Sequence, residues 1–557
     1  MNANERLTEL PRRSVWNGWG DPAKVHGLDE RSWGFLTREI GAQPRLLPER
    51  PVPLGNLKLP GSRLSQAALT AFREALGEAH VSQERQDLAE HLGGKSYPDL
   101  YRARQGDGTH APDVVVFPAD EGEVQAVMDI CAAHDLALIP FGGGTSVVGG
   151  VEGARGGKRA AVSLDLRRLN RLVHLDPQSE VATFGAGMRG PEAEAALQPY
   201  GFTLGHYPQS HQQATIGGYV ATRSAGQAST GYGRVDENVL GARVVTPRGV
   251  LVAGGRSPAS AAGPKLLDLM VGSEGAFGVI TEATLRVHRL PSDKRRACWS
   301  FSSFHAAAAA LRELAQHLGP HLMPDVCRLS DSEETRVTLA LAGQAGAALQ
   351  KYAALRGQKA PCLAIFLWEG NDAASLDWRK TQSERVLARH GGLRLPALVA
   401  EKWEQGRFSG PYLRDDLMGH GLFVETLETA TTWARLEGTY QAVGQAIAGT
   451  LREMGTPAVV QCHVSHVYAA GASLYYTFLS KEAADPLAQW EAVKRAAGQA
   501  ILDSGATITH HHAVGTAHRE ELASEVGDLG LGLLKAVKRE LDPQGILNPG
   551  KLLAEQD

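Results

Sequence analysis

The sequence is poor in cysteine, and no two of its cysteines lie close together. Five occur among 557 residues, namely Cys131, Cys298, Cys327, Cys362 and Cys462. Because no CxxC pair exists, a structural zinc held by cysteines and a disulfide framework are both disfavoured. An odd, sparse set of cysteines is typical of a reducing compartment.

Long hydrophobic runs and a clustered charge of one sign are also missing. No apolar run reaches about 18 residues, so we expect no membrane-spanning segment, and MNANERLTELPRRS lacks the apolar core of a secretory signal. The net charge of −4 argues against nucleic acid as the main partner. We expect a soluble protein, cytoplasmic or at the inner membrane face; Ala/Gly/Arg-rich usage favours a bacterial source.

The length predicts roughly three to four domain-sized units. We expect a mostly helical or irregular N-terminal segment over 1–110, an α+β domain over 111–292, a second mixed domain over 293–490 and a C-terminal segment over 491–557. Short strands alternate with helices in the first domain. After about residue 292 helices are predicted to dominate, with strands only at Leu363–Glu369 and Leu474–Ser480.

Two glycine loops are candidate phosphate-binding elements. Pro140-Phe-Gly-Gly-Gly-Thr-Ser146 follows a predicted strand, and successive glycines can turn several N–H groups toward one anion. Gly185-Ala-Gly187-Met-Arg-Gly190 matches G-x-G-x-x-G but lacks the acidic residue about 20 positions later that dinucleotide binding needs. We therefore predict a strand–helix turn there. Two further segments rich in small residues, 208–226 and 272–280, favour a large flat ligand.

These loops resemble the flavin-binding elements of the vanillyl-alcohol-oxidase type of FAD domain, and most of the chain resembles the alkyldihydroxyacetonephosphate synthases. The motifs that carry the second resemblance are Trp16-Asn-Gly-Trp-Gly20, Gly205-His206-x-Pro208, Val245-Thr-Pro-Arg-Gly249, Tyr412-Leu-Arg414-Asp415, Ala470-Gly-Ala472 with Tyr475, and His510-His-His-x-Val514-Gly515. The resemblance implies an α+β fold: a two-subdomain FAD-binding domain plus an α+β cap.

The resemblance also implies noncovalent FAD, because the loop reads GGGTS without the histidine of covalent relatives. The segment Gln209–Ala214 departs from the family's acidic version. The implied FAD contacts are Pro140, Phe141, Gly142, Gly143, Gly144, Thr145, Ser146, Gln209, Ser210, Thr215, Gly218, Thr222, Ser224, Ala225, Glu274, Gly278 and Ile280.

The histidine run His510-His511-His512 has three interpretations from the residues alone: proton transfer or anion binding, a solvated polar turn, or a metal site. If the run continues a strand, His511 faces away from its two neighbours, and the three cannot share one metal ion. A metal would need His463, His466 and a carboxylate as well. We expect proton transfer or anion binding and no metal.

The resemblance assigns catalytic roles to Tyr475, His511, Arg328, His510 and His512. It implies that Arg414 and His512 hold the phosphate of acyl-dihydroxyacetone phosphate, while Tyr475 and His511 remove a proton from the ester-bearing carbon. Flavin N5 then captures that carbon, and a long-chain alcohol displaces it to form an ether without net redox. Arg328 would position flavin and substrate.

Two other functions stay open at this point. The ending Ile546-Leu-Asn-Pro-Gly-Lys551 also fits an FAD-dependent D-2-hydroxy acid dehydrogenase of lactate or glycolate type, whose metal motifs the chain does not match at His463–His466 or His510–Gly515. A flavin- or lipid-binding protein without activity is the third class, disfavoured by the joint presence of Tyr475, Arg328, Arg414 and the histidines. The resemblance further implies a homodimer and peripheral membrane contact.

Overall fold

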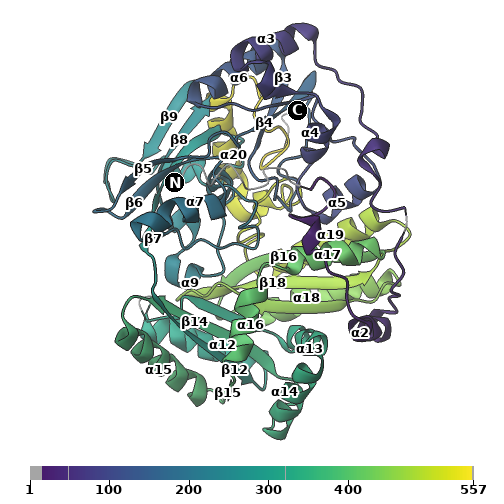
Figure 1. Cartoon of the computed structure of the whole chain (residues 1–557), viewed down its shortest axis with the longest axis vertical. Coiled ribbons are helices and arrows are strands. Elements are labelled where there is room, and N and C mark those ends of the chain that lie inside the picture. Colours follow the sequence, from purple (N-terminus) through teal and green to yellow (C-terminus); the bar gives the residue numbers. More distant parts are fainter. Residues whose placement is uncertain (1–14, 48, 320–321, 555–557) are drawn as a thin grey trace.

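The first sheet positions the glycine loop. The computed structural model describes residues 15–47, 49–319 and 322–554. Its upper part in Figure 1 holds a four-stranded sheet, ordered β1 (Val81–Ser82), β2 (Val114–Val116), β4 (Ala160–Asp165) and β3 (Leu136–Phe141), in which the last three run parallel. Helix α6 (Glu121–His134), capped by Asp120, buries Val124, Val127, Met128 and Cys131. These residues share one helical face, as the sequence predicts.

The second sheet is antiparallel and contains the other glycine motif. Its order is β5 (Leu172–Asp176), β6 (Val181–Gly185), β10 (Val279–Arg286), β8 (Val239–Thr246) and β9 (Gly249–Gly254). A side chain at Gly187, between β6 and α7 (Gly190–Leu197), would overlap the carbonyl oxygen of Leu166. The G-x-G-x-x-G motif is therefore a close-packed strand–helix turn, as predicted.

The lower part of the molecule is built on an antiparallel seven-stranded sheet (Figure 1). Its order is β15 (Leu393–Leu395), β12 (Asp293–Phe301), β14 (Cys362–Gly370), β13 (Val326–Ser330), β17 (Val459–Val464), β18 (Gly471–Lys481) and β16 (Leu422–Thr432). Helices hold more residues than strands in this region, as expected, but the sheet contains far more strands than the two that the sequence predicts. Only β14 and β18 were predicted, because β12 opens with Asp-Lys-Arg-Arg and β16 carries two glutamates, which obscure the strand pattern.

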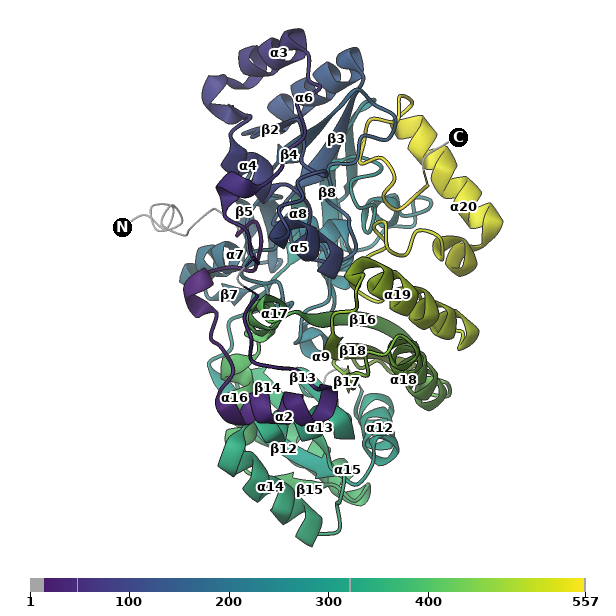
Figure 2. The same cartoon turned by 90° about the vertical axis from the view of Figure 1, so that its right-hand side faces the viewer.

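Helices cover this sheet and connect it to both chain ends. The principal ones are α12 (Phe304–Glu313), α15 (Ala373–Arg389), α18 (Leu436–Glu453) and α19 (Pro486–Asp503). The N-terminal α2 (Glu30–Ile40) buries Trp33, Phe35 and Leu36 against the lower part, whereas α20 (Leu522–Leu541) lies at the edge of the upper part (Figure 2). Beyond α20, Leu138 of β3 pairs with Leu547. Among the described residues, no helix is long and apolar enough to cross a membrane.

The remaining elements are short or peripheral. They are α3 (Gln66–Leu76), α4 (Arg85–Glu90), α5 (Tyr97–Arg104), β7 (Phe202–Thr203), α8 (Ile216–Ala221), α9 (Ser229–Tyr232), α10 (Val235–Asn238), α11 (Leu267–Met270), β11 (His288–Arg289), α13 (Ser332–Leu341), α14 (Gly343–Leu355), α16 (Leu398–Gly406) and α17 (Gly410–Gly419), with tighter or wider turns at Pro22–Lys24, Leu54–Asn56, Glu78–His80, Gln198–Tyr200 and Leu314–Leu318.

Candidate active site

The glycine loop Pro140–Ser146 leaves β3 with its backbone donors unused. Within the described parts of the chain, the N–H groups of 142–146 have no hydrogen-bond acceptor. The loop packs so tightly on the segment 213–215 that a side chain at Gly143 would overlap the carbonyl oxygen of Gln213. Gly144 has a φ of 63°. Consecutive unpaired N–H groups in such a loop form an anion-binding concavity suited to a pyrophosphate.

The other predicted FAD residues fall into two groups. Thr215 accepts the Gly218 N–H at 3.3 Å, Thr222 Oγ1 donates to the Gly218 carbonyl at 2.8 Å, and Ser224 Oγ lies 3.0 Å from His206 Nε2, so these residues shape the wall opposite the loop. The residues of the second group differ in their surroundings. Ala225 and Ile280 are buried, and a side chain at Gly278 would overlap Val244. The Ser210 carbonyl accepts the N–H groups of Gln213 and Ala214, and the exposed Gln209 is bonded to Gln227.

Glu274 joins the upper part of the molecule to the C-terminal segment. Its two carboxylate oxygens accept the N–H groups of Val514 at 2.8 Å and Gly515 at 2.7 Å. Burial raises the pKa of Glu274 to about 7, against the opposing effect of those two hydrogen bonds. The loop that follows the histidine run is thereby fixed beside the cofactor-binding elements.

A cavity of about 420 Å³ lies between these parts. It is bordered by Thr222, Gly272 and Glu274 on one side and by His510, His511, Ala513 and Val514 on the other. Ser273, which follows Gly272, and Gln213, which packs against the glycine loop, each have a buried side-chain oxygen with no hydrogen-bond partner among the described residues. The unpaired loop donors fit the pyrophosphate of a bound FAD, whereas the cavity is bordered by the histidine run and Glu274 and by no residue of 140–146.

A buried glutamate organises the histidine run. Glu428 of β16 accepts Thr509 Oγ1 at 2.7 Å and the backbone N–H groups of His510, His511 and His512 at 2.6, 3.0 and 2.9 Å. Burial opposes its ionisation, but the neighbouring imidazoles and Thr509 outweigh burial and hold the pKa of Glu428 well below its usual value. The carboxylate is therefore charged and fixes the backbone of the run.

The run is irregular rather than a strand, so the expected alternation of its side chains is wrong. His510 Nδ1 and His511 Nδ1 lie 2.9 Å apart, and His510 Nε2 lies 2.6 Å from the Tyr468 hydroxyl. His466 joins the cluster, with its ring centroid 4.8 Å from that of His510. Burial lowers the pKa of His466, His510, His511 and His512. At neutral pH these imidazoles are uncharged and can accept a proton.

Tyr475 lies on the same sheet face as Glu428 and His463. It is paired across the sheet with both residues, through β16 and β17. Its ring is nearly parallel to those of His463 (centroids 4.8 Å apart, 17°) and His511 (5.9 Å, 21°). Burial raises the pKa of Tyr475 to about 12. The structure thus brings four of the predicted catalytic residues together: Tyr475 contacts His511 and His512, the latter with its ring 5.4 Å from that of Tyr475, and His510 contacts His511.

Arg328 reaches this group through a buried ion pair. Its Nη2 donates to Glu334 Oε1 at 2.7 Å and lies 3.1 Å from His463 Nδ1, which is itself 3.1 Å from Glu334 Oε1. Arg328 and His463 outweigh the effect of burial and hold the pKa of Glu334 below its usual value. The His463 ring therefore lies between Arg328 and Tyr475.

Arg414 has guanidinium nitrogens left for a ligand. Its Nη1 donates to the Lys95 carbonyl at 2.8 Å, while Nε and Nη2 are buried and have no hydrogen-bond partner within the described ranges. The next residue, Asp415, accepts the Trp19 N–H at 2.5 Å, and a side chain at Gly20 would overlap Tyr412. The tryptophan motif and the motif Tyr412–Asp415 thus form one contact, which helps position Arg414.

The comparisons with known proteins cover nearly the whole chain. The alkyldihydroxyacetonephosphate synthase of Trypanosoma brucei brucei is 31% identical over 98% of this chain and 93% of its own length, and that of Dictyostelium discoideum is 29% identical over 98% and 94%. The chain belongs to the alkyldihydroxyacetonephosphate synthase family. A solved synthase structure is 28% identical and superimposes with a TM-score of 0.82, covering 97% of this chain and 98% of the other.

Family membership confirms the predicted fold class and FAD as the cofactor. The FAD binding domain matches residues 112–255, and the C-terminal domain of FAD linked oxidases matches 290–552. A mitochondrial D-lactate dehydrogenase of Arabidopsis thaliana is 27% identical over 79% of this chain and 73% of its own length, so the synthases match more of the chain than the dehydrogenase does. The domain boundaries and the role of each residue stay predictions.

Sequence reasoning missed the charged residues that support the synthase site. Glu428 and Glu334 are buried, and Lys95, whose pKa burial lowers to about 8, is buried beside Arg414. The sequence carried little signal for Glu428, because the stretch Leu422–Thr432 that contains it also holds Glu425 and four threonines.

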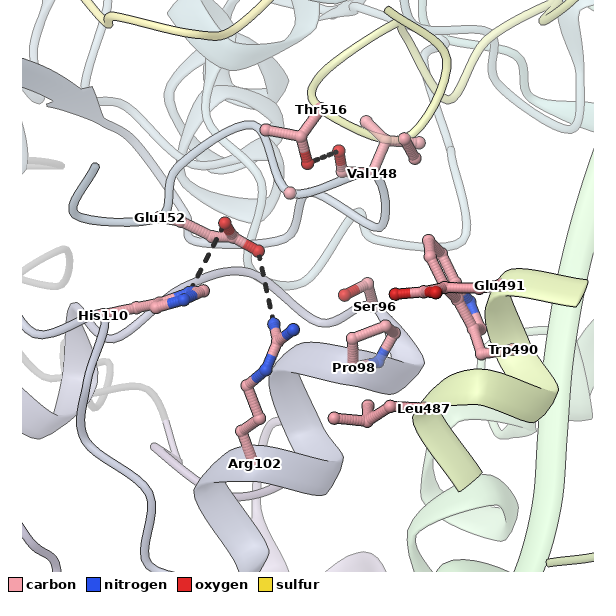
Figure 3. Close-up of a pocket in the computed structure, with 12 residues that line it drawn as sticks. Ser96, Pro98, Arg102, His110, Val148, Glu152, Leu487, Trp490, Glu491 and Thr516 are labelled. Atoms are coloured by element: carbon pink, nitrogen blue, oxygen red, sulfur yellow. Dashed lines mark hydrogen bonds and ion pairs between the residues drawn. The ribbon is translucent and has the colours of Figure 1, made fainter. Parts of the chain in front are cut away.

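A smaller hollow of about 140 Å³ lies behind the loop after the histidine run (Figure 3). Glu152 lies 3.4 Å from His110 Nδ1 and 3.9 Å from Arg102 Nη1, and Thr516 Oγ1 donates to the Val148 carbonyl at 3.2 Å. Leu487 and Trp490 of α19 face these groups. The hollow has no catalytic cluster; it marks the seam between the glycine-loop region and α19.

Proposed function

We propose that this protein exchanges the acyl group of acyl-dihydroxyacetone phosphate for a long-chain alcohol, forming an ether-lipid precursor without net redox. The relationship to synthases over nearly the full chain supports the reaction class. The observation that carries the proposal is the placement of Tyr475 and His511 side by side, with Glu428 holding the histidine run at the edge of the cavity.

The backbone of the glycine loop would hold FAD noncovalently. The loop contains neither histidine nor cysteine, and its free N–H groups match the charge of a pyrophosphate. Bound FAD supplies an electrophilic, electron-accepting centre for the substrate carbon while the fatty acid departs and the alcohol arrives.

The side chains of the lower part would move the proton. Tyr475 is protonated at neutral pH because its pKa is about 12, so it must pass its own proton on as it accepts one from the substrate carbon. His511, whose ring lies nearly parallel to that of Tyr475 with centroids 5.9 Å apart, would take this proton, and Glu428, 3.6 Å from His511 Nδ1, would stabilise the resulting positive charge. His510 fixes the orientation of His511 through its ring nitrogen.

Arg414 and His512 would hold the substrate phosphate. Nε and Nη2 of Arg414 make no hydrogen bond within the described ranges, although Nε lies 3.9 Å from Asp415 Oδ1, and they present the two parallel donors that phosphate oxygens accept. Arg328 contributes positive charge and holds His463 against Tyr475, which supports developing negative charge on the substrate.

Peripheral membrane contact is part of this proposal, with α20 as the contact surface. Leu529 and Leu533 of α20 are 80% and 63% exposed, and Val526 and Leu534 of the same helix line the cavity. An apolar helix face beside the cavity mouth would let acyl and alcohol chains pass from a lipid surface. A homodimer and a bacterial cytoplasmic location complete the proposal; the first rests on family resemblance and the second on composition.

The decisive assay mixes the purified flavoprotein with acyl-dihydroxyacetone phosphate and labelled hexadecanol. We expect label in an ether product. Tyr475→Phe should retain FAD but lower kcat by about 10³-fold, the range of lost acid–base catalysis. Tyr476→Phe is the matched control, since that hydroxyl donates to the backbone carbonyls of Thr439 and Tyr440. A protein that binds FAD and never incorporates the alcohol contradicts the proposal.

The dehydrogenase alternative is tested by anaerobic mixing with D-lactate, D-glycolate or D-2-hydroxyglutarate. A synthase should leave the flavin absorbance unchanged after mixing with each of these hydroxy acids. Rapid bleaching of the flavin band by any of the three would assign the protein to the dehydrogenases instead.

A further inference from the structure

Three imidazoles converge at the edge of the cavity from two separate segments. His466 follows β17, and His510 and His511 belong to the histidine run; one ring nitrogen of each lies within 4.8 Å of those of the other two. The proposed reaction uses His511 and His510 but leaves His466 unexplained. His463, three residues earlier, is directed elsewhere, toward Glu334 and Arg328.

We propose that His466, His510 and His511 form a binding site for a divalent transition-metal ion, with open coordination positions toward the cavity. Two nitrogen ligands on one such ion, each about 2.0–2.1 Å from it, lie about 3 Å apart when they are neighbours in the coordination shell. His510 Nδ1 and His511 Nδ1 are 2.9 Å apart. His466 needs only a small ring movement to become the third ligand.

The outer nitrogens of two of the rings already have the partners that ligating histidines need. His466 Nδ1 lies 2.6 Å from Ser229 Oγ, which leaves Nε2 for the metal. His510 Nε2 lies 2.6 Å from the Tyr468 hydroxyl, which leaves Nδ1. Such contacts fix the tautomer and the ring orientation of a metal ligand.

The surrounding charges favour a cation that prefers nitrogen. Glu428 lies 3.6 Å from His511 Nδ1 and supplies a buried negative charge. The nearby Arg234 is paired with Asp236 at 2.9 Å, which offsets its charge. A site of three imidazoles, with no carboxylate bound directly to the metal, suits Zn²⁺, Co²⁺ or Ni²⁺ rather than Mg²⁺ or Ca²⁺. Since His510 and His511 line the cavity, water or a substrate oxygen can complete the coordination.

Such an ion would inhibit rather than assist, a consequence that rests on the proposed function. A divalent ion on His511 Nδ1 withdraws electron density from the ring, which makes its other nitrogen a poorer acceptor for the Tyr475 proton. Metal binding and proton transfer therefore compete for one imidazole, and the metal is no resident cofactor.

Metal binding is measured on the FAD-loaded protein without substrate, so its outcome is independent of any synthase assay. We expect titration with ZnCl₂ against a chromophoric chelator to give one tight site per chain, and zinc X-ray absorption to give three imidazole ligands. His466→Gln should weaken Zn²⁺ binding by about 100-fold, and Ser229→Ala by about 10-fold. His463→Gln and His518→Gln are matched controls and should retain the site.

The flavin content of each variant shows whether it has folded. Should His466→Gln lose flavin, Ser229→Ala and the absorption spectrum of the unmodified protein still decide the question. Equal Zn²⁺ affinity in His466→Gln and the unmodified protein, or an oxygen-rich coordination shell, overturns the site. Zn²⁺ binding without loss of ether synthesis overturns the competition alone.

Discussion

The glycine loop and the histidine face recognise their ligands by opposite means. The loop is one continuous stretch whose backbone N–H groups are unpaired and whose missing side chains bring it against 213–215. The histidine face is assembled from β16, β17, β18 and the C-terminal segment, and Glu428 of β16 fixes the backbone that carries the histidine side chains. Ligand binding by the loop depends on glycines, which have no side chain, whereas the arrangement of the histidine side chains depends on the buried charge of Glu428.

The largest effect on FAD binding is expected from adding one methyl group to the loop. In Gly143→Ala the new Cβ would overlap the carbonyl oxygen of Gln213 and the Cα of Ala214, both backbone atoms that cannot rotate away. The displaced loop should bind FAD about 100-fold more weakly, because overpacking costs about 1–3 kcal/mol. Flavin content after purification and a binding titration measure this. Gly61→Ala, with open space around it, is the control.

If Gly143→Ala retained full FAD affinity, the loop would not be a rigid backbone cradle, and the contrast between the two regions would fail.

The reverse test removes the charge under the histidine face. In Glu428→Gln one amide must replace a carboxylate that accepts three backbone N–H groups and the Thr509 hydroxyl. At least one donor then meets an NH₂ group, at a cost of about 3 kcal/mol. We expect kcat to fall about 100-fold with FAD still bound. Glu425→Gln, a buried acid on the same strand bonded to Trp490, should change kcat far less.

Loss of FAD in Glu428→Gln, with kcat per bound flavin unchanged, would show that the residue supports the cofactor and not the histidines.

The same contrast explains how much the sequence could predict. The loop at 140–146 was identified because strand, glycines and hydroxyl residues are contiguous, so local rules suffice. Tyr475 and the histidines were identified through motifs. Glu428 and the irregular path of 507–512 were missed, because a buried carboxylate that accepts backbone donors replaces the strand that β-branched Thr507, Ile508 and Thr509 would otherwise form. That outcome depends on tertiary contacts between β16 and a segment about 80 residues away.

Glu274 connects the two regions and should make stability depend on pH. Its pKa is about 7 in the folded chain against an ordinary 4.5, so between these values the folded chain keeps a proton that the unfolded chain releases. The stabilising contribution is therefore complete below about pH 4.5 and is lost as the pH rises through 7. The whole difference is about 3 kcal/mol.

Thermal unfolding of the unmodified protein and Glu274→Gln, measured from pH 5 to 8.5, isolates this contribution from the other titrating groups. The unmodified protein should lose stability relative to the variant as the pH rises. Parallel profiles for the two proteins would show that the Val514 and Gly515 N–H groups keep the carboxylate ionised in the fold despite its burial.

The smallest expected effect concerns Arg414, which lies at the border of the two regions. Its Nη1 is committed to the Lys95 carbonyl, while Nε and Nη2 are left for a phosphate. A lysine has one nitrogen and cannot serve both, so Arg414→Lys should raise the KM for acyl-dihydroxyacetone phosphate about 20-fold. The KM for the alcohol should not change, because the alcohol has no anionic group for Arg414 to bind. The exposed Arg356→Lys is the control. An equal rise in both KM values would mean that Arg414 maintains the shape of the cavity and does not bind the phosphate.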